Sequence, residues 1–99
     1  MAYTLKFEAD AWGEWQELDK SVREPLKKKL TKRLDSPRVP NDKLVGNLKD
    51  CYKIKNNKTG HRLIYQVIDH EVVVLVLSVD KRERLEAHKK AAERIAKRR

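Results

Sequence analysis

The segment from residue 50 to residue 78 constrains the fold most, because it contains three apolar runs joined by very short links. The runs cover 50–56, 61–68 and 71–78, and the links are "NNKTG" and "DH". Apolar and polar residues alternate along the first two runs, which is the period of a β-strand. Links of this length form hairpins, so we expect three antiparallel strands in sequence order. The stretch "VVVLVLS" in the third run is apolar on both faces, which predicts a central strand covered by helices.

The start of the chain predicts a short strand followed by a helix. In "AYTLKF" the apolar side chains alternate with polar ones, as in a half-buried strand. From Glu8 to Leu18, apolar residues recur at every third position, which places them along one side of a helix. These residues are Ala9, Trp12, Trp15 and Leu18. Two tryptophans in a basic protein can stack on RNA bases, but at helical spacing we assign both to the core.

A second helix is predicted to begin at "SVRE", where Ser21 is the N-cap and Glu24 completes a capping box. It ends before Ser36 and Pro37, and its buried stripe consists of Val22, Leu26, Leu30 and Leu34. The opposite face carries Lys27, Lys28, Lys29, Lys32 and Arg33. Such a run is usually a solvated face, although contact with an RNA backbone stays open. The link between the two helices is short, so we expect them to form an antiparallel hairpin.

The remaining segments are a loop and a basic tail. Residues 37–49 contain two prolines and several turn formers, which predicts a loop. The tail, residues 81–99, holds nine basic and three acidic residues and so contributes +6 of the net charge of +9. Its thin apolar stripe consists of Leu85, Ala92 and Ile95. We therefore expect residues 83–99 to form a basic C-terminal helix that docks weakly and can move or be replaced by a partner.

Together these elements predict one α+β domain over residues 1–99. It contains an N-terminal strand, a helical hairpin, a three-stranded antiparallel meander that completes a four-stranded sheet, and a C-terminal helix. We expect the first strand to lie beside the last one. A chain of 99 residues is long enough for one core and too short for a second lobe.

Composition narrows the classes of function. The chain has 24 Lys and Arg against 15 Asp and Glu, so a polyanion is the natural partner, unless the charge serves only solubility. Cys51 is the single cysteine, and no Cys/His spacing suits zinc, so we expect no disulfide within the chain, no metal and no cofactor. The first residues lack the apolar run of a signal peptide, and no stretch is long enough to span a membrane. We therefore expect a soluble cytoplasmic protein without a membrane partner.

Basic residues are predicted to converge on one face of the sheet. In "CYKIK" the strand period puts Lys53 and Lys55 on one face and Tyr52 and Ile54 on the other. The register that buries the apolar residues of the next strand turns Arg62 toward the two lysines. The segment "DKRER" then adds Lys81, Arg82 and Arg84 at the end of the third run. An ordinary solvated face explains part of this pattern, but the face carries almost no acidic residues, and a bound phosphate would relieve the repulsion.

The order of these elements, with the runs "DCYKIK", "YQVID" and "KRER", is similar to the RelE toxins of bacterial type II toxin–antitoxin pairs, in the RelE/ParE superfamily. The likeness extends from "MAYTLKF" through "SVREPLKKKL" and "SPR" to "KRER". It implies the RelE-like microbial RNase fold. It also implies an endoribonuclease that enters the A site of the 70S ribosome, beside 16S rRNA, cuts the mRNA there and halts translation. A cognate RelB-like antitoxin that wraps the toxin is implied as its partner.

The resemblance also implies roles for individual residues. Lys55 is the general base on the ribose 2′-OH, Lys53 and Arg62 stabilise the charged phosphorane, and Arg82 assists the leaving 5′-oxygen. The products are a 2′,3′-cyclic phosphate and a 5′-hydroxyl, and the cations supply the stabilisation without a metal. A lysine of ordinary pKa is protonated at pH 7, so a base role requires neighbouring charges that disfavour the charged form. Arginine hardly deprotonates, so Arg82 is better described as a charge stabiliser than as a proton donor.

Two positions depart from the RelE pattern. His88 stands where RelE has a tyrosine, and it can stack on a base, act as general acid, or be an ordinary exposed histidine. Val45 stands where RelE has a basic residue, which puts one substrate contact in doubt, though Lys43 or Lys49 can supply charge nearby.

Lys81 and Arg84 are further expected RNA contacts. His61 and His70 lie at hairpin turns, where we expect them to be solvated.

Two alternatives to an enzyme remain from the sequence. In one, the same cations bind RNA or the ribosome without chemistry. In the other, the basic surface serves mainly to hold an acidic or amphipathic antitoxin segment. Codon preference and the stoichiometry of an antitoxin complex do not follow from the sequence.

Overall fold

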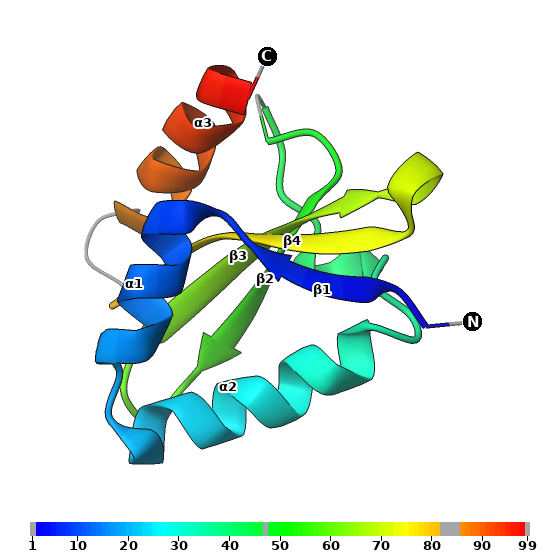
Figure 1. Cartoon of the computed structure of the whole chain (residues 1–99). Helices are drawn as coiled ribbons and strands as arrows, with labels where there is room; N and C mark the ends of the chain where they lie inside the picture. Colours follow the sequence, from blue (N-terminus) through cyan, green and yellow to red (C-terminus); the bar gives the residue numbers. More distant parts are fainter. Residues whose placement is uncertain (1, 47, 82–85, 99) are drawn as a thin grey trace.

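The computed structural model describes residues 2–46, 48–81 and 86–98. In chain order its elements are β1 (Thr4–Phe7), α1 (Ala9–Glu17), α2 (Lys20–Arg33), the short 3₁₀ helix η1 (Pro40–Asp42), β2 (Cys51–Asn56), β3 (His61–Ile68), the 3₁₀ turn η2 (Asp69–Glu71), β4 (Val73–Lys81) and α3 (Glu86–Arg98). Figure 1 shows this path from the blue N-terminus to the red C-terminal helix. The strands predicted from the apolar runs are all present, but the third covers Val73–Lys81 instead of 71–78, because the turn before it includes η2.

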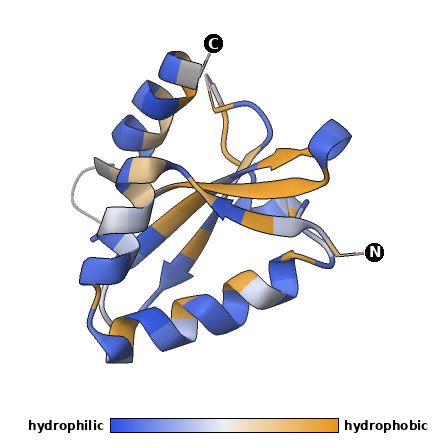
Figure 2. Ribbon diagram, viewed as in Figure 1, coloured by the Kyte–Doolittle hydropathy of each residue, from blue (hydrophilic) through white to orange (hydrophobic). Residues whose placement is uncertain are grey.

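The strands form one sheet in the order β1-β4-β3-β2. β1 runs parallel to β4, and β2, β3 and β4 pair antiparallel in sequence order, as expected. The pairing between β3 and β4 shifts between Ile64 and Tyr65, and this irregularity leaves Leu77 without a partner across the ladder. β2 therefore lies at one edge of the sheet and β1 at the other, while the most apolar strand, β4, lies inside (Figure 2).

The sheet is covered on both faces, which accounts for the continuous apolar sequence of β4. One hydrophobic cluster joins α1 and α2 to one face of the sheet. The second cluster joins α3 and the loop residues Leu44 and Leu48 to the other face. Val74 and Val76 belong to the first cluster, and Val73, Leu75 and Leu77 belong to the second. The two-sided burial of β4 predicted from "VVVLVLS" is thus confirmed.

Helix α1 buries a different stripe from the predicted one. Its buried residues are Ala11 and Trp15, whereas Trp12 is 47% exposed. The assignment of Trp12 to the core was therefore wrong, because a spacing of three residues drifts off one face of a helix that turns every 3.6 residues. Trp12 still contacts Phe7 edge to face, with ring centroids 5.1 Å apart. On the edge strand β1, Leu5 is likewise 36% exposed.

Helix α2 begins one residue before the predicted N-cap. Asp19 is the N-cap residue and its side chain makes no cap hydrogen bond, so the capping box predicted for Ser21 and Glu24 was wrong. The predicted stripe is present, with Val22, Leu26 and Leu30 buried. In Figure 1, α1 and α2 point in different directions from their short link, so the helical hairpin is open rather than closely paired. α1 contacts β4, and α2 contacts the edge strand β2.

Helix α3 lies against β3 and β4. Ala87 and Ala91 are fully buried, and Ala92 and Ile95 pack against the same cluster. Leu85, which was expected in this stripe, lies outside the described residues. The hydroxyl of Ser78 donates to the carbonyl of Ala87 at 2.8 Å, so α3 is also fixed by a buried polar contact. No helix in the described part of the chain combines the length and the apolar character needed to cross a membrane.

Candidate active site

The two strand lysines lie on the face of the sheet that α3 covers. Tyr52 and Ile54 point into the cluster beneath α1 and α2, so alternation along β2 turns Lys53 and Lys55 to the other face. Arg62 on β3 lies directly opposite Lys55 in the register. Cross-strand partners share a face, so the register brings a lysine and an arginine side by side. Together they line a hollow of about 190 Å³ at the turn between β2 and β3.

His88 joins this group from above the sheet. It lies on α3, and its side chain is partly buried. Burial lowers the pKa of His88 below its usual value, and the positive charges of Arg62 and Lys53 lower it further. His88 Nδ1 is buried and has no hydrogen-bond partner among the residues that the structure describes. The neutral imidazole is therefore favoured, and it lies within electrostatic reach of two predicted site residues.

An acidic residue also belongs to this face, contrary to the expectation that acids are almost absent from it. Asp80 on β4 is the register partner of Arg62. Its carboxylate forms an ion pair with Lys90 of α3 at 2.7 Å, and it accepts a hydrogen bond from the Lys81 backbone N–H at 2.8 Å. The cationic face is thus bounded on the β4 side by a carboxylate that is already paired with α3.

Sequence reasoning missed the group that holds α3 in place. Glu14 of α1 accepts hydrogen bonds from both terminal nitrogens of Arg94, from Lys90 and from the Val79 backbone N–H, each at 3.0 Å. Arg94 also donates to the carbonyl of Leu77 at 2.7 Å. Burial alone would raise the pKa of Glu14, but the hydrogen bonds from Arg94, Val79 and Lys90 outweigh it and hold the pKa below its usual value. The signal in the sequence was an acid three residues after the buried Ala11, on the same face of the helix.

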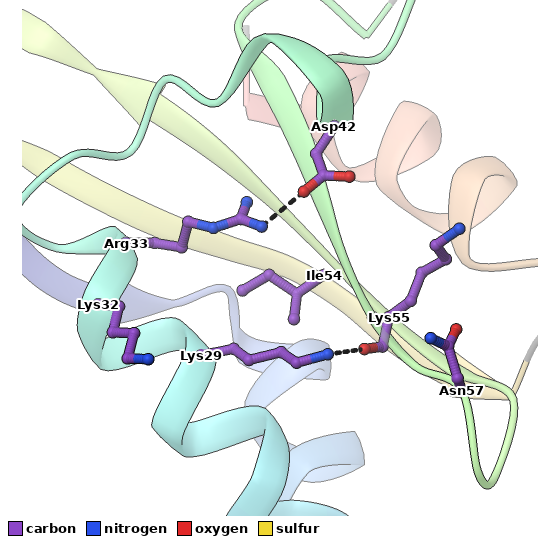
Figure 3. A pocket seen from close by; sticks show the side chains of 7 residues that line it. All are labelled: Lys29, Lys32, Arg33, Asp42, Ile54, Lys55 and Asn57. Carbon is purple, nitrogen blue, oxygen red and sulfur yellow. Dashed lines mark hydrogen bonds and ion pairs between the residues drawn. The ribbon is translucent and has the colours of Figure 1, made fainter.

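The edge of β2 is covered by cations from α2. Lys29 Nζ donates to the carbonyl of Lys55 at 2.7 Å (Figure 3). Arg33 Nη1 donates to the carbonyl of Lys53 at 3.4 Å. Arg33 also pairs with Asp42 at 2.6 Å and donates to the Tyr65 hydroxyl at 3.0 Å. These contacts satisfy carbonyl groups that an edge strand otherwise leaves open. The expectation of a solvated face is confirmed for Lys29, which is exposed, but was wrong for Arg33, whose side chain is 16% exposed because it packs beside the buried stripe of α2.

The other predicted contacts are spread around this site. Lys43 forms an isolated antiparallel bridge with Tyr52, so it lies next to Lys53 along the edge of the sheet. Lys49 is exposed and lies before β2. Lys81 ends β4 opposite His61, so alternation turns it to the other face from Arg62. Val45 is 87% exposed. Arg82 and Arg84 lie outside the described residues.

The two turn histidines behave differently. His70 is exposed, as expected. His61 is not simply solvated, because its Nδ1 lies 2.8 Å from Thr59 Oγ1 and the ring is partly buried. Burial lowers the pKa of His61, and the charge of Lys81 lowers it further.

No cluster of three or more metal-binding side chains occurs in the described part of the chain. Cys51 is buried, and burial raises the pKa of its thiol to about 12, so it stays protonated. The groups that can act chemically at this face are therefore the lysines, the arginine and the imidazole.

The fold and this cationic face define a family of bacterial toxins. The family model for the ParE toxin of the type II toxin–antitoxin system, parDE, matches residues 5–86, and the chain belongs to the RelE/ParE family of type II toxins. It is 55% identical over 95 residues to the mRNA interferase toxin RelE of Escherichia coli, which covers 96% of this chain and 99% of that relative. A putative RelE-like toxin protein of Escherichia coli is 48% identical over the same length.

Solved structures agree with this assignment. An arginine double mutant of E. coli RelE in the free state matches with a TM-score of 0.88 at 53% identity, over 96% of this chain and 99% of that chain. The toxin chain of the intact E. coli RelBE toxin–antitoxin complex matches with a TM-score of 0.80 at 55% identity, over 84% of this chain and 100% of that chain. The predicted family and the predicted α+β fold are confirmed.

Proposed function

We propose that this protein is a ribosome-dependent mRNA endonuclease that cleaves messages in the ribosomal A site and so inhibits translation. The observation that carries the proposal is the shared face of Lys53, Lys55 and Arg62, with His88 above it, in a chain of the RelE/ParE family. A relative that is 55% identical over nearly its full length is named an mRNA interferase toxin. Cations gathered on one face suit a phosphodiester, because its negative charge increases during cleavage.

The proposed reaction is attack by a ribose 2′-oxygen on the adjacent phosphorus. Lys55 takes the proton of the 2′-OH, and Lys53 and Arg62 stabilise the added negative charge of the phosphorane. The P–O5′ bond then breaks, which leaves a 2′,3′-cyclic phosphate on one fragment. The 5′-oxygen takes up a proton and becomes the hydroxyl of the other fragment. We propose that His88 donates that proton in its protonated form, which is the minor form because its pKa is lowered, and that Arg82 stabilises the leaving oxygen.

The proposal includes a RelB-like antitoxin as partner. The toxin of the E. coli RelBE complex, which is 55% identical to this chain, is bound to such an antitoxin. The excess of basic residues, 24 against 15 acidic ones, favours association with an acidic segment as well as with RNA. The proposed site of action of this protein is the bacterial cytoplasm, where 70S ribosomes bring mRNA and 16S rRNA together.

Primer extension on mRNA incubated with the protein, with and without 70S ribosomes, tests this function. We expect cuts within codons only when ribosomes are present. Lys55→Ala should lower the cleavage rate at least about 100-fold, the usual contribution of a general base, with ribosome binding largely retained. Lys6→Ala is the matched control, since Lys6 is an exposed strand lysine at the opposite edge of the sheet. An intact message with tight ribosome binding would instead identify a non-catalytic binder.

A further inference from the structure

A second basic cleft lies between α2 and the edge strand β2, on the other side of Lys55 from the proposed active site. It has a volume of about 370 Å³ and is lined by Lys29, Lys32, Arg33, Asp42, Ile54, Lys55 and Asn57. In Figure 3 the carbonyl of Lys55 faces Lys29, while its side chain points away toward the side of the sheet that bears α3. Lys55 thus forms part of the wall of both hollows.

The cleft has an excess of positive charge that the protein itself does not neutralise. Asp42 is the one carboxylate among the described residues that line the cleft, and it is already paired with Arg33 at 2.6 Å. Lys29 donates to a neutral carbonyl, so its ammonium charge is not compensated. The side chain of Lys32 is exposed and makes no hydrogen bond or ion pair with any residue in the described part of the chain. Like charges held this close repel each other, and a bound anion would relieve the repulsion.

The shape and polarity of the cleft distinguish between two kinds of anion. An acidic amphipathic peptide needs apolar pockets for its anchoring side chains. Among the described residues that line the cleft, Ile54 is the only apolar one, and it is 1% exposed, so these residues provide no such anchor. A phosphate needs only cations and hydrogen-bond donors, which the lysines, the guanidinium and the amide of Asn57 supply. The lining therefore favours a nucleic-acid backbone over a protein segment.

We propose that this α2–β2 cleft is a subsite for a backbone phosphate of RNA, so that RNA is held on both sides of β2. The inference rests on the proposed function, since the phosphodiester to be cleaved occupies the hollow at Lys55 and Arg62. A second phosphate in the cleft would fix the position of the strand without taking part in the chemistry. The phosphate belongs either to the message or to ribosomal RNA, which present the same chemical group.

Lys32→Gln tests the subsite, because it removes one charge from an exposed side chain without disturbing a contact of the fold. Lys20→Gln, at the start of the same helix and away from the cleft, is the matched control. Binding is measured to ribosomes without message, to ribosomes carrying message and to a free oligonucleotide, each over a range of salt concentrations. The RNA carries 2′-O-methyl groups, so that it is not cut.

We expect Lys32→Gln to weaken binding roughly three- to tenfold and to reduce the salt slope by about 0.7, as the loss of one phosphate contact predicts. The control should match the wild type. If the effect requires message or appears with the oligonucleotide, the phosphate is that of the message; if it persists on ribosomes without message, it is that of ribosomal RNA. Equal binding by Lys32→Gln and Lys20→Gln would overturn the subsite, as would an effect confined to antitoxin binding.

The two proposals fail separately in these experiments. A subsite that is wrong leaves ribosome-dependent cleavage by the wild type intact. A proposed function that is wrong removes cleavage, while the difference in RNA binding between Lys32→Gln and Lys20→Gln would still reveal a bound phosphate.

Discussion

Replacing Glu14 with Gln should weaken the attachment of α3 to the rest of the fold. The carboxylate joins three elements, because it lies on α1 and accepts hydrogen bonds from the β4 backbone and from Arg94 and Lys90 of α3. Glutamine keeps the size of the side chain but removes the charge. Its amide N–H group would face the N–H donors of Arg94, Lys90 and the Val79 backbone, which need an acceptor. Arg94 would keep the carbonyl of Leu77 as a partner, so the loss is partial.

The magnitude follows from the number of charged contacts and their burial. Hydrogen bonds to charged groups contribute about 1.5–3 kcal/mol each, and breaking one side of a buried ion pair costs about 3–5 kcal/mol. The Glu14 side chain is 19% exposed, so solvent screens part of the attraction between its carboxylate and the two cations. We therefore expect Glu14→Gln to lower the free energy of unfolding by about 2–3 kcal/mol at pH 7. Glu17→Gln, an equal charge change on the exposed side of α1, should cost less than about 0.5 kcal/mol.

The destabilisation caused by Glu14→Gln should depend on pH in a predictable direction. The pKa of Glu14 is held below its usual value of 4.5 in the folded protein. A carboxyl group of this kind contributes its full stability above the unfolded pKa and loses it as pH falls through the folded pKa. The difference in unfolding free energy between wild type and Glu14→Gln should therefore shrink once pH falls below 4.5. Urea unfolding at pH 7 and near pH 3 measures that difference, and amide hydrogen exchange reports whether α3 opens first.

Equal stabilities of the two glutamine variants at pH 7 would refute this reasoning, and so would a difference that is undiminished at low pH. The weak docking expected for residues 83–99 remains a prediction, and hydrogen exchange of the wild-type α3 amides tests it.

Two further predictions concern the site and its support. As the general acid, His88 contributes only where it is protonated, so His88→Ala should lower the cleavage rate by about 100-fold at a pH below its lowered pKa, which is itself below 6.5. The difference between wild type and variant should disappear as pH rises through that pKa. Rate profiles that run parallel across pH would contradict the acid role. Tyr65→Phe removes a hydroxyl that donates to the carbonyl of Pro37 at 2.6 Å and accepts from Arg33, so we expect a loss of about 1–3 kcal/mol in urea unfolding. An unchanged midpoint would show that these contacts do not support the β2 edge.

The strands were predictable because their sequence carries its own period. Alternation in "CYKIK" fixed the faces of Lys53 and Lys55, and the short links between the runs required hairpins. The face of Arg62 then followed from burying the apolar side chains of β3, and the structure pairs Arg62 directly with Lys55. Local pattern was enough here because a one-residue slip would expose a whole apolar face.

Contacts between elements distant in sequence were not predictable. Glu14 and Arg94 are 80 residues apart, and no pattern in either segment indicates that the two side chains pair. The sequence placed Arg33 on the basic, solvated face of α2. In the structure its guanidinium donates hydrogen bonds to Asp42 and to the Tyr65 hydroxyl, which keep it partly buried. The misplaced Trp12 has a simpler cause, since a spacing of three was taken as a helical face. Tertiary pairing, rather than propensity, decided the positions of Glu14, Arg94 and Arg33.

The most direct test of the central claim uses a ribosome-bound message with a single 2′-deoxynucleotide at the position where the wild-type message is cut. The cationic face is proposed to cleave RNA through the neighbouring 2′-oxygen, so this message should bind normally and stay intact at that position. Cleavage there at the rate of the all-ribose message would contradict the proposed role of Lys55 and of the face it shares with Arg62.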